Sequence, residues 1–82
     1  MASEKIDEAV EILDELYNDK TIPKNIKALI TNVKQELQSN KDKDIKIDSA
    51  LLIIDSIAND TNLPVYARTQ VWKAVSILES EE

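Results

Sequence analysis

The sequence predicts an all-α protein, specifically an up-and-down four-helix bundle made of two repeated helical hairpins. Its 82 residues include no glycine, so the chain has little access to the positive φ angles that tight β-hairpins need. Apolar residues recur every three or four positions over four stretches, which is typical of amphipathic helices. A shift of 41 positions superposes the second half of the chain on the first, so the four stretches form two copies of one hairpin.

The repeat is clearest in two segments, which we name the first elbow (residues 18–23) and the second elbow (residues 59–64). The repeated residues are Asn18, Asp19 and Pro23 in the first elbow and Asn59, Asp60 and Pro64 in the second. Asparagine and aspartate can bond nearby backbone groups and end a helix, whereas proline suits the first helical position, where its missing N–H costs nothing. We therefore expect each elbow to join two helices and to have a structural role.

The first hairpin is expected over about residues 3–40. Its first helix should run from about Glu4 to Tyr17, with Ser3 as the N-cap, because a serine hydroxyl can accept a bond from an amide of the first turn. Its second helix should run from about Pro23 to Gln38. Each of these helices carries one apolar stripe that the other helices can bury.

The second hairpin is expected over about residues 44–79, and the whole chain, residues 1–82, is expected to be a single domain. The third helix should begin near Ile45 with Asp44 as its N-cap, and the fourth should run from about Pro64 to Glu79. A repeat of this length also fits HEAT-type solenoids, but these bury their faces by stacking and need about three or more copies. Two hairpins can instead close on each other, so we favour the bundle.

The composition restricts the chemistry that is available. The chain contains no histidine and no cysteine, which excludes zinc sites, thiol nucleophiles and histidine general bases. Without glycine it has no glycine-rich phosphate loop. We therefore expect a protein that is not an enzyme and has no cofactor, and we rank an enzyme using only carboxylates, lysine and tyrosine third. The N-terminus does not resemble a signal peptide and no apolar run has membrane-span length, so we expect a cytoplasmic protein without membrane contact.

The residues that follow each elbow proline extend the repeat into a longer motif. Residues 59–68 have the form Asn-Asp-x-x-Leu-Pro-x-x-Ala-Arg and are followed by Trp72 and by Leu-Glu at residues 78–79. The earlier motif, at residues 18–26, is Asn-Asp-Lys-Thr-Ile-Pro-Lys-Asn-Ile. Over nearly its whole length the chain resembles a group of small archaeal proteins, uncharacterised protein family 0147. The resemblance implies an all-helical bundle from an archaeal cytoplasm, and it implies no activity and no catalytic residues.

Two sets of charged residues near the elbows have structural and functional interpretations. Asp14 and Asp55 occupy equivalent positions, four residues before the elbow asparagines. We expect them to bond the opposing elbow or to cap a helix end, and a hard-cation site built from their oxygens is the alternative, although their spacing matches no known loop. We also expect Asp60 and Arg68 to form a salt bridge across the second elbow, with anion binding by Arg68 as the alternative.

Several residues outside the expected apolar stripes are candidates for a partner contact. They are Ile45, Leu52, Val65, Arg68 and Trp72. Aromatic and arginine residues outside a core often anchor protein contacts. Our first hypothesis is therefore a non-enzymatic protein–protein interaction module, with a second copy of the chain as one partner to consider. In the competing interpretation, Trp72 covers the small bundle and a loop shields Leu52.

The second hypothesis is association with RNA or the ribosome through a lysine strip. The strip consists of Lys27, Lys34 and Lys41, which are seven residues apart. It lies in residues 20–46, where seven lysines and three acidic residues give +4, in a chain with a net charge of −6. We favour internal complementarity between this stretch and its acidic neighbours, because no aromatic residues are interleaved with the lysines as RNA binding would require.

Overall fold

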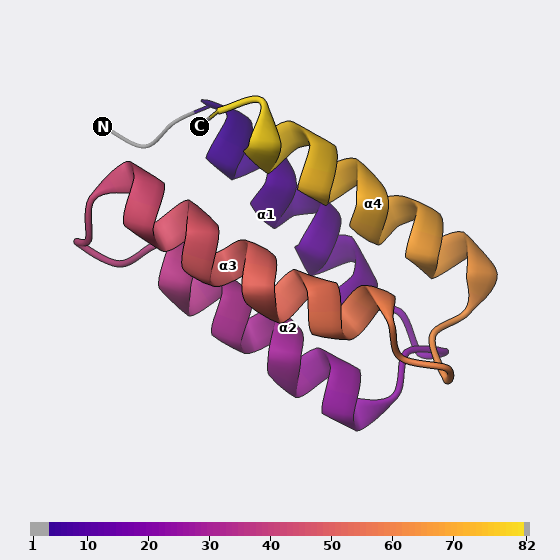
Figure 1. The fold of residues 1–82 in the computed structure, drawn as a ribbon. Coiled ribbons are helices and arrows are strands. Elements are labelled where there is room, and N and C mark those ends of the chain that lie inside the picture. The colour runs from indigo at the N-terminus through magenta and orange to yellow at the C-terminus, as the bar shows by residue number, and fades with distance from the viewer. Residues whose placement is uncertain (1–3, 82) are drawn as a thin grey trace.

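The computed structural model describes residues 4–81. This part of the chain forms four helices, α1 (Glu4–Tyr17), α2 (Lys24–Leu37), α3 (Lys43–Ala58) and α4 (Val65–Glu79). They pack side by side as an all-α four-helix bundle with both elbows at one end (Figure 1). The predicted fold class is therefore confirmed, whereas the N-cap predicted at Ser3 lies outside the described residues. None of the described helices has the length and apolar content of a membrane span.

The helices follow one another around the bundle, so α1 lies opposite α3 and α2 lies opposite α4. The closest packing joins α2 to α3 and α1 to α4, which are pairs of helices from different hairpins. The two helices within each hairpin pack on each other less extensively. The α1/α2 and α3/α4 faces are therefore the more open sides of the bundle, and the repeat makes them equivalent.

One apolar core fills the bundle and contains equivalent residues from both hairpins. All four helices contribute fully buried side chains, for example Leu13, Ile26, Ile54 and Val71. Ile22 and Leu63, one from each elbow, are each 4% exposed and close the core at the elbow end. Complete burial of a leucine or isoleucine is worth about 1.5–3 kcal/mol relative to exposure, so the core is the main source of stability.

The helix boundaries agree with the predictions at the first helix and differ slightly elsewhere. Pro23 and Pro64 are N-caps with extended backbone (ψ 152° and 148°), so α2 and α4 begin one residue after each proline. The prediction of Asp44 as the N-cap of α3 is wrong, because Asp42 has that position and its carbonyl accepts the first helical bond, from the Lys46 amide at 3.0 Å. Asp44 lies instead in the first turn, where the helix dipole favours negative charge.

Both elbows have the same hydrogen-bond geometry. The Asp19 carboxylate accepts a 2.8 Å bond from the Thr21 amide, and the Asp60 carboxylate accepts a 2.8 Å bond from the Asn62 amide. Each aspartate amide also donates to a carbonyl three residues earlier, at 3.1 Å in both copies, and so ends the preceding helix. Because the aspartate side chain fixes the turn, the described chain reverses direction at both elbows without any residue of positive φ.

Each elbow also contacts the first turn of a helix from the other hairpin. The Tyr66 hydroxyl, in α4, donates to the Asp19 carboxylate of the first elbow. The Asn25 amide, at the equivalent position of α2, donates to the Asp60 carboxylate of the second elbow at 3.2 Å. Hydrogen bonds from Thr21 and Tyr66 lower the pKa of Asp19, and the bond to Asp19 raises the pKa of Tyr66. These crossed contacts join the two hairpins at the elbow end of the bundle.

Candidate contact groove between α3 and α4

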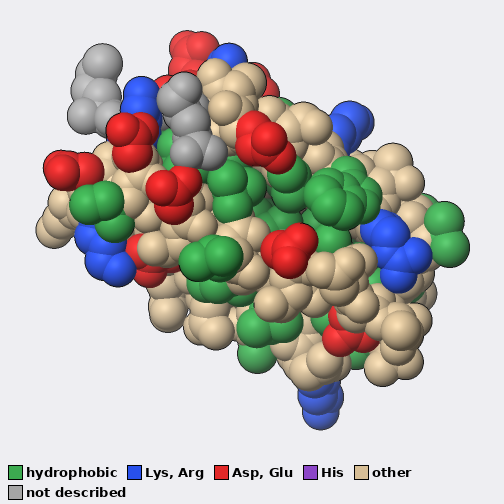
Figure 2. All heavy atoms as spheres, in the orientation of Figure 1, with side chains coloured by type: hydrophobic (Ala, Val, Ile, Leu, Met, Phe, Trp, Pro, Cys, Tyr) green, Lys and Arg blue, Asp and Glu red, His purple; other side chains and the backbone are tan. Residues whose placement is uncertain are grey.

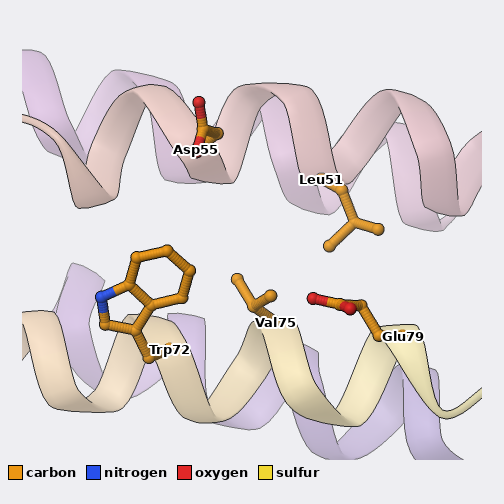
Figure 3. Close-up of a pocket in the computed structure, with 5 residues that line it drawn as sticks. All are labelled: Leu51, Asp55, Trp72, Val75 and Glu79. Carbon is orange, nitrogen blue, oxygen red and sulfur yellow. The ribbon is translucent and has the colours of Figure 1, made fainter.

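A groove lies between the two helices of the second hairpin, and we name it the α3/α4 groove. It has a volume of about 170 Å³ and is lined by Leu51, Asp55, Trp72, Val75 and Glu79. Leu51 points from α3 toward α4, whereas Trp72 and Val75 point from α4 toward α3 (Figure 3). Figure 2 shows hydrophobic side chains gathered along this face, with acidic side chains beside them.

The α3/α4 groove combines an apolar floor with an acidic rim. Val75 is 8% exposed and belongs to the core, whereas Trp72 is 48% exposed. Asp55 and Glu79 are exposed, and within residues 4–81 neither carboxylate has a hydrogen bond or an ion pair. The described side chains that line the groove include no basic residue. The groove therefore offers an apolar contact next to negative charge that is not compensated.

The equivalent face of the first hairpin is arranged differently. There the Lys34 ammonium pairs with the Asp14 carboxylate and lies 5.8 Å from the centre of the Tyr17 ring. A shift of 41 positions places Asp14 on Asp55 and Lys34 on Val75. The same carboxylate is therefore compensated by a lysine between α1 and α2, and among residues 4–81 has no such partner between α3 and α4.

Of the residues predicted to contact a partner, Trp72 lines the groove. The other apolar candidates, Ile45, Leu52 and Val65, do not. Ile45, Leu52 and Val65 are 53%, 75% and 77% exposed. Successive residues of a helix point about 100° apart, so Leu52 projects away from the bundle while Leu51 beside it enters the groove. Leu51, Val75 and Glu79 line the groove but were not among the residues predicted to contact a partner.

Arg68 forms neither the predicted salt bridge nor part of the groove lining. Its guanidinium donates to two main-chain carbonyls at the end of α3, those of Ala58 at 3.1 Å and Asp60 at 3.2 Å. The Asp60 carboxylate is bonded to Asn62 and Asn25 instead. The last carbonyls of a helix lack partners within the helix, and a planar guanidinium can bond two of them at once. The prediction of an Asp60–Arg68 ion pair is therefore wrong, and Arg68 caps α3.

The lysine strip is engaged within its own chain. Lys27 lies 6.0 Å from the centre of the Tyr17 ring, Lys34 pairs with Asp14, and Lys41 bonds Glu36 at 2.7 Å. Of these three contacts, only the Lys34–Asp14 pair joins the basic stretch to an acidic residue outside it, as internal complementarity predicts.

Among the described residues, the carboxylates of Asp14 and Asp55 neither bond the opposing elbow nor cap a helix end as predicted, although their main-chain carbonyls accept bonds at 3.1 Å from the amides of Asn18 and Asn59. The Asp14 carboxylate pairs with Lys34 of the other helix in its hairpin, whereas Asp55 lines the α3/α4 groove. Among residues 4–81 no group of three or more acidic, histidine or cysteine side chains is placed to hold a metal ion. Asp55 has one acidic neighbour in the groove, Glu79, whereas Ca²⁺ takes six to eight oxygen ligands.

Comparisons with known proteins place the whole chain in one family. The model of a family described as "Uncharacterised protein family (UPF0147)" matches residues 1–80. A UPF0147 protein of Archaeoglobus fulgidus is 32% identical over 79 residues, which cover 96% of this chain and 91% of the relative. One from Methanocaldococcus jannaschii is 39% identical, with 95% of this chain and 90% of the relative covered.

Two solved structures extend the similarity to the fold. The crystal structure of a UPF0147 protein from Thermoplasma acidophilum has a TM-score of 0.90 at 33% identity and covers 99% of this chain and 96% of its own. A crystal structure of a protein of unknown function has a TM-score of 0.87 at 32% identity and covers 98% and 94%. The chain thus belongs to the uncharacterised archaeal protein family UPF0147, as its elbow motifs indicated.

Proposed function

We propose that the protein is a non-enzymatic protein–protein interaction module and that the α3/α4 groove is its contact surface. The observation that carries this proposal is the difference between two equivalent faces. The first hairpin fills its face with Lys34, whereas the second leaves Trp72 half exposed beside two carboxylates that have no partner within residues 4–81. Tryptophan is among the residue types that most often dominate the energy of a protein contact.

The alternative of RNA binding has no such support. Each lysine of the strip already has an acidic or aromatic neighbour in its own chain, so binding a phosphate would first require breaking that contact. Among the described residues one exposed aromatic side chain, Tyr17, lies beside Lys27 and Lys34, and a single ring already in contact with two lysines is a small platform for stacking bases. We therefore develop the protein-contact function alone.

Photo-crosslinking in cells tests whether the groove meets another protein. A photo-reactive phenylalanine analogue replaces Trp72 in one variant and Thr31, the equivalent residue of the first hairpin, in a control. We expect a discrete crosslinked product from position 72 that position 31 does not give. The captured protein, once identified by mass spectrometry and purified, should bind the wild-type protein and bind Trp72→Ala more weakly. Absence of any product specific to position 72 in a folded variant contradicts the proposal.

Sedimentation distinguishes a second copy from a different partner. Self-association through this face predicts that the wild-type mass rises with concentration and that Trp72→Ala lowers it, whereas a decrease caused by Leu52→Glu alone would place the contact on the outer side of α3. A wild-type protein that stays monomeric at high concentration, with neither variant changing its mass, excludes a second copy as the partner and leaves a different protein.

A further inference from the structure

We infer that the α3/α4 groove binds a lysine or arginine side chain presented by a partner protein, an inference that rests on the proposed contact function. The first hairpin provides the model for this contact within the same molecule. Its equivalent face already holds a basic side chain, Lys34, whose ammonium contacts one carboxylate and one aromatic ring. The second hairpin has the carboxylate and an aromatic ring, but no lysine of its own at that position.

The lysine site of the first hairpin has three parts. Asp14, from α1, supplies the negative charge and pairs with the Lys34 ammonium. Tyr17, one turn later on α1, supplies the ring, whose centre lies 5.8 Å from the same ammonium, within the range of cation–π attraction. The Lys34 side chain is 29% exposed, so its aliphatic part is largely covered while its charge reaches the surface. This face shows that the fold can hold a basic side chain between the helices of a hairpin.

The second hairpin has the corresponding parts without the lysine. Asp55 stands at the position of Asp14, and Val75 stands at the position of Lys34. The ring comes from the opposite helix, because α4 carries Trp72 whereas the position of Tyr17 is occupied in α3 by buried Ala58. Tryptophan is the best cation–π partner among the aromatic residues. The groove is therefore equipped for a basic side chain that its own hairpin does not supply.

The size of the groove suits a single side chain. Its volume of about 170 Å³ far exceeds what one water molecule needs. It is slightly larger than an apolar protein cavity of about 150 Å³ that accepts benzene. The stem of a lysine or arginine can lie along Leu51 and Val75 while its charged end reaches Glu79, whose carboxylate points toward Val75 (Figure 3), and Asp55 lines the groove from α3.

The charge around the groove favours a cation over an anion or a neutral group. Asp44 and Asp48 lie seven and three residues before Leu51 in α3, and Asp55 lies four after it, so all four share one side of the helix. All three aspartates are exposed. The nearby guanidinium of Arg68 is held at the carbonyls that end α3. A partner with a basic segment therefore meets a complementary surface.

A second copy of the chain is a poor source of the basic side chain. The protein carries a net charge of −6, so two copies repel each other at low salt. Within the described residues, Lys34, Lys41 and Lys43 are paired with carboxylates of their own chain, whereas Lys20, Lys24 and Lys73 are exposed without such a pair. The net charge therefore carries the preference for a different, basic protein as the occupant.

Fluorescence gives a direct test, because Trp72 is the sole tryptophan of the chain and lines the groove. Synthetic alanine-rich helical peptides carrying lysine or arginine are titrated into the full protein, with a peptide carrying glutamine at the same positions as the control. We expect the two basic peptides to change the emission of Trp72 in a saturable way and the glutamine peptide to leave it unchanged. The effect should weaken as salt is raised, because both carboxylates are exposed.

Matched variants separate the groove from general charge attraction. Asp55→Asn keeps the shape of the side chain, and we expect it to weaken binding of the basic peptides by about threefold to tenfold. Asp14→Asn removes the same charge from the first hairpin and should leave the affinity unchanged. Val75→Lys fills the groove from within and should abolish the response. Circular dichroism checks that each variant is folded. If Val75→Lys does not fold, the test rests on Asp55→Asn, which should fold because Asp55 is exposed.

Three outcomes would overturn the inference. They are the absence of a saturable response to either basic peptide, an equal response to the glutamine peptide, and an equal loss of affinity in Asp14→Asn and Asp55→Asn. If crosslinking at position 72 captures a partner but the basic peptides fail in one of these ways, the contact function stands and the choice of a basic side chain is wrong. If both experiments fail, the contact function is wrong as well.

Discussion

Lys34 lies between the helices of the first hairpin and pairs with Asp14, whereas Val75 occupies the equivalent position of the second hairpin and leaves Asp55 without an ionic partner. The two copies otherwise correspond closely, because the elbow backbones form matching hydrogen bonds and the core buries mostly equivalent positions. Residues that both copies share can be explained by folding. A lysine between the two helices of a hairpin is not required for folding, since the second hairpin has none at that position.

The first prediction concerns equivalent core residues, where the two hairpins should contribute equally to stability. Leu13→Ala and Ile54→Ala remove equivalent side chains that are both 0% exposed. We expect each to lower the free energy of unfolding by about 2–5 kcal/mol, through lost burial and the cavity left behind. Chains of this length have total stabilities of roughly 4–12 kcal/mol, so either change is severe. Urea unfolding measures both, and a cost below about 1 kcal/mol for one of them would show that the two copies do not contribute equally to the core.

The second prediction concerns a position where the copies differ. Arg68→Lys should lower the free energy of unfolding by about 1–2 kcal/mol, because an ammonium cannot bond the carbonyls of Ala58 and Asp60 as the guanidinium does. Lys27 occupies the equivalent position of the first hairpin and makes no such bond, so Lys27→Arg should be close to neutral. Denaturant unfolding of both variants measures the difference. An equally small effect in both would show that Arg68 does not stabilise the end of α3.

The sequence was sufficient to predict the fold because the fold depends on features that are local or periodic. Apolar spacing, the two elbow prolines and the lack of glycine all indicate helical hairpins without any knowledge of tertiary contacts. The error at Asp44 has a local cause, since Asp42 and Asp44 are both suitable N-caps and the choice between them depends on where the loop from α2 ends.

The groove could not be predicted in the same way, because it depends on which side of a helix faces its neighbour. Leu51 and Leu52 are equally apolar in sequence, but the packing of α3 on α4 directs one into the groove and the other to the surface. Arg68 and Asp60 were suitable partners by charge, yet the free carbonyls at the end of α3 lie within reach of the guanidinium. The 41-residue shift already places Val75 on Lys34 in the sequence. Only the structure shows that Lys34 pairs with Asp14 and that Val75 lines a groove.

The third prediction compares the two equivalent aspartates. Asp14→Asn should lower the free energy of unfolding by about 0–1 kcal/mol, because its ion pair with Lys34 is partly exposed. Asp55→Asn should have no measurable cost, since this carboxylate has no partner among the described residues. A double-mutant cycle with Lys34→Gln isolates the pair, and a coupling energy of zero would show that the ion pair itself does not stabilise the protein.

The smallest expected effect is pH-dependent and compares the two crossed contacts between elbows. Tyr66→Phe removes the hydroxyl that donates to Asp19. The pKa of Asp19 is lowered from 3.8 in the folded state, so its contribution to stability is present above that value and is lost as the pH falls through its folded pKa. The pKa of Tyr66 is raised from 10.0, so its contribution is present below that value and is lost as the pH rises through its folded pKa.

The stability difference between wild type and Tyr66→Phe should therefore be largest at pH values between the folded-state pKa of Asp19 and that of Tyr66. It should decrease at more acid and at more alkaline pH. Thermal unfolding followed by circular dichroism across this range measures it. Asn25→Ala is the matched control, because the Asn25 amide makes the equivalent contact to Asp60 and does not titrate. Its difference from wild type should persist on the alkaline side. If the stability difference between Tyr66→Phe and wild type also persists at alkaline pH, Tyr66 stabilises the elbow through packing and not through its bond to Asp19. The two crossed contacts would then have the same dependence on pH.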